Sequence, residues 1–253
     1  FSRAIANRVW ANFFGRGLVE QVDDLRLSNP ASNEGLLDAA AAHVVDADFD
    51  LKELMRTILR SQTYQRSSLP LAENRDEFKY LSRYYPRRLM AEVMLDGIDQ
   101  VLQTTTVFNE VAFPGADKQK TDFYKQGTRA IELYDASVNS YFLKTFGRNP
   151  REITCECERS NKPSMIQVLH LSNGDTLNNN LRSNQSCVNT MITQSNDNII
   201  DEAYLLCLSR RPSDSERKRL QKIFEVTPET ERRSVVEDLL WALMTSREFL
   251  FQH

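Results

Sequence analysis

The chain has 253 residues, enough for one large domain or two small ones with a real hydrophobic core. Hydrophobic residues make up 41% and charged residues 26% of the sequence, the usual proportions of a globular protein. The formal net charge is −3, so no overall positive field would attract nucleic acid, and apolar runs such as residues 239–244 are too short to span a membrane. We therefore expect no nucleic acid partner and no membrane span.

Helical periodicity dominates the first hundred residues. Apolar side chains recur at the i, i+4 spacing over residues 5–14, which predicts a first helix. A second helix is predicted after Ser32, which could cap it, and a third after Asp50. Pro86 suits the first turn of a fourth helix, which apolar residues continue to Leu102.

The helical pattern fails over residues 103–128, which carry a Thr run, a Pro-Gly turn and a charged stretch. This composition predicts a long irregular connection. Within residues 105–134 we expect a short strand pair, formed by residues 106–113 and 129–134. A connection this long is a candidate lid or partner-binding excursion, and a plain surface loop is the alternative.

Helices resume after residue 128 and continue to the end of the chain. The predicted segments are residues 136–147, a helix opened by Pro163, residues 198–210, a helix capped by Ser213 with Glu216 at the capping-box spacing, and residues 232–251.

These patterns predict a mainly α fold, a single irregular multi-helix domain over residues 1–253. Within it we expect two helical lobes, at about residues 1–102 and 129–253, on either side of the 103–128 excursion. Phe1 already lies in an amphipathic pattern, so we expect the chain to be a fragment of a longer polypeptide.

Two cysteines one residue apart form the pattern most suggestive of chemistry. Cys155 and Cys157 would face the same side of an extended segment, so one metal ion could take both thiolates, with His170 and Cys187 as further ligands. Structural zinc sites use a second matched pair of cysteines, which this sequence does not contain. A structural turn, or a disulfide to Cys187 or Cys207, therefore remains an alternative to a metal or redox site.

Other cofactor and nucleophile patterns are missing from the sequence. No Cys-x-x-Cys-His string occurs, so we expect no c-type haem and no other cofactor in this segment. No Gly-x-Ser-x-Gly string occurs either, which disfavours a Ser–His–Asp hydrolase. His170 falls near the end of a predicted helix, where the negative end of the helix dipole favours an imidazolium.

Two acid pairs, each followed by an arginine, are candidate catalytic groups. The residues concerned are Asp23, Asp24 and Arg26, and Glu156, Glu158 and Arg159. Two carboxylates in opposed environments could serve as general acid and base, as in glycoside hydrolysis. Acids adjacent in sequence rarely face one another, so structural salt bridges are the simpler interpretation.

Seven strings that follow one another along the chain carry a family pattern. They are NRVWANFFGRGLVEQVDDLRLSNPASNEGLLD, FDLKELMRTILRSQTYQRSS, YPRRLMAEVMLDGI, RAIELYDASVNSYFLKTFGRNPRE, TCECERSNKPSMIQVLHLSNG, YLLCLSRRPSDSE and LLWALMTSREFLFQH. Together they resemble a planctomycete-specific domain of unknown function, the C-terminal "PSD-one" type domain of cytochrome-associated secreted proteins.

The resemblance implies an extracytoplasmic protein, periplasmic or secreted, in which a c-type haem would belong only to other domains of the full chain. It brings no activity and no catalytic residue. Cys155, Cys157 and Arg159 match the family's pattern, whereas Cys187 and Cys207 do not look like part of it. This departure weakens a site built from all four cysteines.

Three hypotheses about function follow. The first is an accessory or interaction module that packs against the preceding domains of its own chain; it is not an enzyme by itself, and it predicts an exposed apolar patch near the N-terminus. The second is part of an enzyme that degrades extracellular polysaccharide, with one acid pair in a cleft. The third is a metal or redox site at Cys155 and Cys157.

Overall fold

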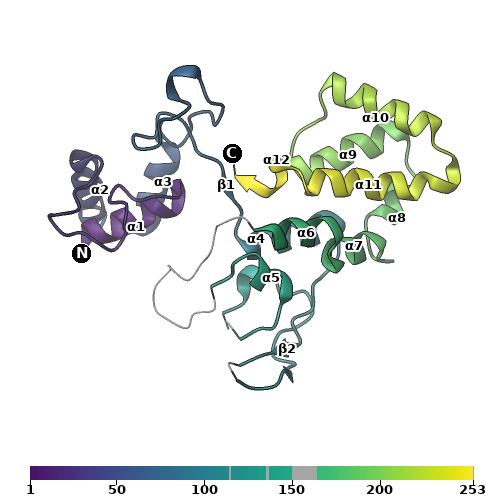
Figure 1. Cartoon of the computed structure of the whole chain (residues 1–253), viewed down its shortest axis with the longest axis horizontal. Helices are drawn as coiled ribbons and strands as arrows, with labels where there is room; N and C mark the ends of the chain where they lie inside the picture. The colour runs from purple at the N-terminus through teal and green to yellow at the C-terminus, as the bar shows by residue number, and fades with distance from the viewer. Residues whose placement is uncertain (114, 135–136, 150–163, 253) are drawn as a thin grey trace. The chain divides into compact units, whose positions relative to one another are not determined.

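The computed structural model describes residues 1–113, 115–134, 137–149 and 164–252, and the chain divides into two compact units, Phe1–Arg87 and Arg88–Gln252 (Figure 1). Helices predominate in both, which confirms the mainly α fold. The division falls at residues 87 and 88, and not at the expected excursion, because the helix that ends at Leu102 packs on later helices of the second unit.

The first unit is built on three helices and one turn of 3₁₀ helix. These are α1 (Ser2–Phe14), α2 (Glu34–Asp46), α3 (Leu51–Arg60) and η1 (Ala72–Asn74). The apolar row predicted for the first helix lies in the core, where Trp10 stacks on Phe14 with ring centroids 4.2 Å apart. Leu37 of α2 and Leu54 of α3 are buried in the same cluster.

The caps of the first unit agree in part with the sequence. Asp50 caps α3 as predicted, since its carboxylate accepts the N–H of Lys52 at 2.8 Å. Asn33 caps α2 in place of Ser32, and its side chain accepts the N–H of Leu36. Ser32 lies one residue too early, where its own N–H donates to the carbonyl of Leu18.

A buried amide holds the loop that follows α1. Asn7, which is fully buried, donates to the carbonyls of Val19 and Val22 and accepts the N–H of Val19. The loop turns so tightly over Asn7 that a Cβ on Gly17 would lie 2.3 Å from the loop's own carbonyl oxygen at Val19 and 2.7 Å from Oδ1 of Asn7. Glycine is therefore required at this position.

The second unit contains most of the remaining elements. Its helices and 3₁₀ turns are α4 (Ala91–Leu102), η2 (Ala130–Glu132), α5 (Tyr141–Thr145), α6 (Met165–Asn173), α7 (Asp175–Arg182), α8 (Val188–Met191), α9 (Asn196–Leu208), α10 (Asp214–Val226), η4 (Glu229–Glu231), α11 (Arg232–Met244) and α12 (Arg247–Leu250). The strands in the described part of the chain form two pairs, β1 (Arg87–Arg88) with β4 (Phe251–Gln252) and β2 (Glu110–Val111) with β3 (Gln119–Lys120).

The prediction that Pro86 opens a helix is wrong. The next two residues form β1, and α4 begins only at Ala91. The N–H of Leu89 donates to the carbonyl of Leu250 at 2.9 Å, a bond to the far end of the chain that replaces a helical turn here.

A strand pair within residues 105–134 is confirmed, but its second strand is not residues 129–134. Glu110 pairs with Lys120 and Val111 with Gln119 in an antiparallel register. Residues 130–132 instead form η2, because the carboxylate of Asp96 on α4 accepts the N–H groups of Ala130 and Ile131.

The core of the second unit centres on α4, α9 and α11. Each contributes fully buried aliphatic side chains, among them Leu95, Ile200 and Leu240. Helix α11 packs against α7, α8, α9 and α12. Helix α7 is tied to α4 by the amide of Asn180, which donates to Asp99 at 3.0 Å. These contacts fix α7 and α11 with respect to each other.

An arginine joins three elements of the second unit. Arg210, just after α9, donates to Glu248 of α12 at 2.6 and 2.9 Å and to Glu216 of α10 at 3.0 Å. Glu216 also forms the predicted capping box with Ser213. The family string that contains Arg210 and Glu216 therefore serves to hold helices together.

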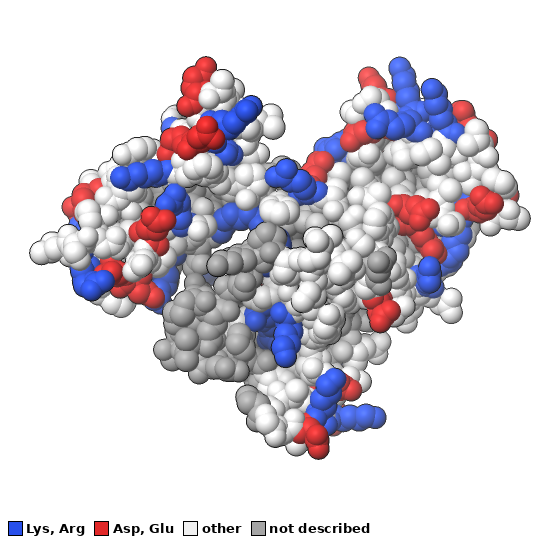
Figure 2. Space-filling view, viewed as in Figure 1, with Lys and Arg blue, Asp and Glu red and all other residues white. Residues whose placement is uncertain are grey.

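No helix in the described ranges is both long and apolar enough to cross a membrane. Figure 2 shows Lys and Arg side chains interspersed with Asp and Glu over the face in view.

Candidate functional site

The predicted acid pair of the first unit is split between two arginines. Asp23 pairs with Arg8, while Asp24 forms a two-pronged bond with Arg26 at 2.7 and 2.6 Å. Hydrogen bonds from Arg26 lower the pKa of Asp24, so this carboxyl is ionised and is a poor proton donor. Each acid thus pairs with its own arginine, in an arrangement unlike that of a general acid and base.

A shallow depression does accompany Asp24. It has a volume of about 340 Å³ and is lined by Glu20, Gln21, Asp24, Arg26, Ser28 and Asn29. Asp23 is not among the lining residues. The depression therefore holds two carboxylates, Glu20 and Asp24, and each already pairs with an arginine, Arg16 and Arg26 respectively.

The second acid pair and the cysteine pair lie outside the described residues. This concerns Glu156, Glu158, Arg159, Cys155 and Cys157. The metal or redox site at the two cysteines stays a prediction, which elemental analysis combined with a thiol count would test.

His170, the third candidate metal ligand, lies among aromatic rings. The ring centroids of Tyr141, Phe142 and Phe146 are 5.2, 5.6 and 6.0 Å from that of the imidazole. Its Nε2 atom is 3.3 Å from the hydroxyl oxygen of Thr176. Within the described ranges no cluster of three or more His, Cys, Asp or Glu side chains could hold a metal ion.

Burial lowers the pKa of His170, so the neutral imidazole is favoured. His170 does lie in the last turn of α6, as expected, but burial disfavours the imidazolium proposed for this position. Helix α6 continues to Asn173, and the aromatic packing outweighs the helix dipole at this position.

The two remaining cysteines are buried free thiols. Burial raises the pKa of Cys187 to about 11 and that of Cys207 to about 12. The Sγ atom of Cys187 donates to the carbonyl of Val101 at 3.2 Å. Neither sulfur forms a disulfide or offers a thiolate to a metal ion.

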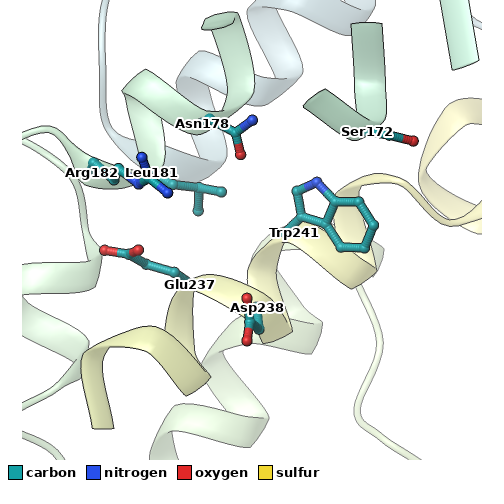
Figure 3. Close-up of a pocket in the computed structure, with 7 residues that line it drawn as sticks. All are labelled: Ser172, Asn178, Leu181, Arg182, Glu237, Asp238 and Trp241. Atoms are coloured by element: carbon teal, nitrogen blue, oxygen red, sulfur yellow. The ribbon is translucent and has the colours of Figure 1, made fainter. Parts of the chain in front are cut away.

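A cavity that the sequence did not predict lies between α7 and α11. Its volume is about 280 Å³ (Figure 3). The residues that line it are Ser172, Asn178, Leu181, Arg182, Glu237, Asp238 and Trp241. Its walls therefore combine one indole ring with charged groups of both signs, an amide and a hydroxyl.

Helical spacing brings these side chains together. Asn178, Leu181 and Arg182 lie at i, i+3 and i+4 of α7, and Glu237 and Trp241 lie at i and i+4 of α11. The two rows face each other, and Asn178 and Trp241 point toward one another across the cavity (Figure 3). The opposite side of α11 carries buried core residues such as Leu240, which fix the orientation of the helix.

Of the two acids in the cavity, Glu237 is held by an arginine, whereas Asp238 is available to a ligand. Glu237 accepts from Arg233 at 2.6 Å, and Arg233 in turn donates to Asn189 at 2.6 Å. Asp238 and Arg182 are exposed and have no hydrogen-bond or ion-pair partner among the residues described. The cavity therefore presents polar groups that a ligand can engage.

A sequence signal for this cavity existed in the segment EDLLW, residues 237–241. The segment reads as an amphipathic helix because of its leucines, and that part of the prediction holds. Two acids three and four residues before a tryptophan lie on the same helix face as its ring, which marks a candidate ligand surface. The partner residues on α7 could not be found in this way.

Comparison with known protein families finds one family model that matches most of the chain. The family PSD1, described as a protein of unknown function (DUF1553), matches residues 1–224. The chain belongs to the PSD1 family. Searches of curated proteins and of solved structures gave no match.

The matched range contains the whole first unit and the second unit as far as Phe224 in α10. It includes the cavity residues of α6 and α7, whereas those of α11 lie beyond it.

Proposed function

We propose that this domain is an interaction module and that the surface around Phe1 docks against the preceding domains of the same polypeptide. One observation carries the proposal. The side chain of Phe1 is 87% exposed and lies against Phe49, itself 46% exposed, with ring centroids 5.9 Å apart. Two adjacent exposed phenylalanines are unusual on a free surface and typical of a contact surface.

The backbone at Phe49 supports the same conclusion. Asp48 and Phe49 both have positive φ angles, 49° and 62°, in the turn between α2 and α3. Residues other than glycine cost roughly 1–2 kcal/mol each in this region. Glycine or asparagine would form the turn at lower cost, so retaining a phenylalanine there favours a role for its exposed ring.

The neighbouring residues extend the apolar surface. Val45 near the end of α2 and Leu51 at the start of α3 are also exposed. We define the N-terminal patch as Phe1, Val45, Phe49 and Leu51. We assign the patch to preceding domains of the same chain because the family resemblance of the strings quoted above favours a multidomain protein.

Hydrogen exchange in the full-length protein, compared with residues 1–253 alone, tests the proposal. We expect slower amide exchange around residues 44–51 in the full-length chain, and loss of this protection in the Phe49→Ser variant. Val226→Ser is the matched control, because Val226 is equally apolar, 81% exposed and lies at the end of α10. Equal exchange in both proteins would refute docking at the N-terminal patch.

The cellular setting of the module is a further part of the proposal. Export from the cytoplasm and a neighbouring c-type cytochrome domain are supported by the family resemblance of the strings quoted above. Cell fractionation and haem staining of the full-length protein test both, and a cytoplasmic, haem-free product would contradict them.

The polysaccharide-degrading enzyme has less support. A glycosidase needs one protonated and one ionised carboxyl, whereas Asp23 and Asp24 each pair with an arginine. This pairing supports a binding role for the first unit over hydrolysis.

A further inference from the structure

We propose that the cavity between α7 and α11 is a binding site for a neutral polyhydroxylated ring, that is, for one or two residues of an oligosaccharide. The site belongs to the second unit and is independent of the N-terminal patch, so either proposal can fail alone.

The indole ring of Trp241 supplies the apolar surface. The ring is partly buried against the core and also lines the cavity, so it is held in place while one part of it can receive a ligand. The apolar C–H face of a sugar ring packs on an aromatic ring in the same way that other apolar groups do. No other aromatic side chain lines the cavity.

The polar groups around Trp241 include both hydrogen-bond donors and acceptors, as the vicinal hydroxyls of a sugar require. Each hydroxyl both donates and accepts, and a carboxylate can accept from two neighbouring hydroxyls at once. Glu237 and Asp238 supply acceptors, and Arg182 supplies donors on the opposite wall. Bonds to charged partners are the stronger class of hydrogen bond.

Two of these groups are already oriented. Arg233 fixes Glu237, and Asn189 fixes Arg233 while it also donates to the carbonyls of Ser183, Asn184 and Ser186. The amide nitrogen of Asn178 donates to the carbonyl of Gly174 at 3.1 Å, so its oxygen is turned to other partners. Pre-oriented groups lower the entropy cost of binding.

Charge and size favour a neutral ligand of modest dimensions. The walls carry Arg182 on one side and Glu237 and Asp238 on the other, so an anion would meet two like charges and a simple cation would meet one. The volume of about 280 Å³ lies at the lower limit of ligand pockets, roughly 300–1,000 Å³. One or two rings fit this volume better than a large cofactor.

Nuclear magnetic resonance offers a direct test because the chain has only two tryptophans, Trp10 and Trp241. Trp10 is buried in the first unit and serves as an internal reference. The probes are cellotetraose, xylotetraose and maltotetraose at up to about 10 mM, since single-site sugar affinities are weak. We expect at least one of them to shift the indole N–H signal of Trp241 in a saturable way and to leave that of Trp10 in place.

Exposed variants separate binding from folding. Asp238→Asn and Arg182→Gln lie at the rim and should fold normally, and each should weaken binding by roughly fivefold or more. Asp46→Asn, an exposed aspartate at the end of α2, is the matched control and should bind as the wild type does. Trp241→Leu should abolish binding.

Three results would overturn the proposal. The first is that none of the three sugars shifts the Trp241 signal. The second is that the rim variants bind the sugars as tightly as the wild type does. The third is that tetramethylammonium shifts the Trp241 signal and the sugars do not, which would define a cation site.

Discussion

The side-chain amide of Asn7 and the backbone of Val19 exchange two hydrogen bonds, one in each direction. Nδ2 donates to the carbonyl oxygen at 3.2 Å, and the Val19 N–H donates to Oδ1 at 3.0 Å. The backbone groups of an irregular loop have no neighbouring strand or helical turn to bond with. The amide of Asn7 supplies these hydrogen bonds and so joins the loop to α1. Asn7 is thus a structural residue of the first family string.

Replacing Asn7 by alanine should destabilise the first unit by about 2–4 kcal/mol, because buried backbone groups of Val19 and Val22 would lose their partners. Urea unfolding followed by Trp10 fluorescence, in a Trp241→Phe background, measures the change. Asn12→Ala on the exposed side of α1 is the matched control, expected within about 0.5 kcal/mol of the parent. A loss below about 1 kcal/mol for Asn7→Ala would contradict this role.

Two glycines of the first unit should respond in opposite directions to alanine. In Gly17→Ala the new Cβ would lie 2.3 Å from the carbonyl of Val19, which should cost about 1–3 kcal/mol. In Gly35→Ala it would meet only Asn33 Oδ1 at 3.7 Å, and the better helix propensity should stabilise α2 by up to about 1 kcal/mol. The same unfolding assay decides, and a tolerated Gly17→Ala would show that the loop can move away.

Acid should weaken the second unit through Glu216. Hydrogen bonds from Arg210, and then from Ser213, lower the pKa of Glu216 from 4.5 to about 2. The folded state thus binds this proton less readily than the unfolded state, so the stabilisation is complete above pH 4.5 and is lost as pH falls toward 2. Glu216→Gln should lower the melting temperature at pH 7 and should reduce the further loss between pH 7 and pH 3.

Glu225→Gln is the control for this experiment, because Glu225 is an exposed acid on the same helix. It should melt and respond to acid like the wild type. If Glu216→Gln lost as much stability on acidification as the wild type, the Arg210 cluster would not be the source of the acid sensitivity.

The buried thiols should be unreactive in the folded protein. Burial raises the pKa of Cys187 and Cys207 to about 11 and about 12, so the thiolate is scarce at pH 8. In a Cys155→Ser/Cys157→Ser variant, we expect Ellman's reagent to react roughly a hundredfold more slowly in buffer than in denaturant. Comparable rates in the two solvents would mean that these thiols are accessible.

Local chemistry was the predictable part of the fold. Asp50 and the Ser213–Glu216 capping box act on neighbouring N–H groups, so their spacing in the sequence is sufficient to place helix starts. Residues 86–90 and 130–132 were wrongly predicted because their N–H groups bond to Leu250 and Asp96, distant partners that no local pattern reveals.

The candidate site was harder to predict for the same reason. The acid pair at Asp23 and Asp24 stood out in the sequence, yet Arg8 and Arg26 engage its two carboxylates separately. The cavity around Trp241 depends on α7, a short polar helix whose position is set by Asp99 and by packing on α11. Its composition alone, with three consecutive asparagines, suggests a loop.

The position of α11 determines where an expressed fragment of this protein can end. The PSD1 match stops at Phe224, but Val236, Leu240 and Met244 of α11 fill the centre of the second unit, and Glu248 neutralises Arg210. A protein ended at the edge of the family match would lose a central helix of the core and one of the two acids that pair with Arg210. The family match therefore ends at residue 224, whereas the folded unit extends to Gln252. Expression designs should follow the boundary of the folded unit.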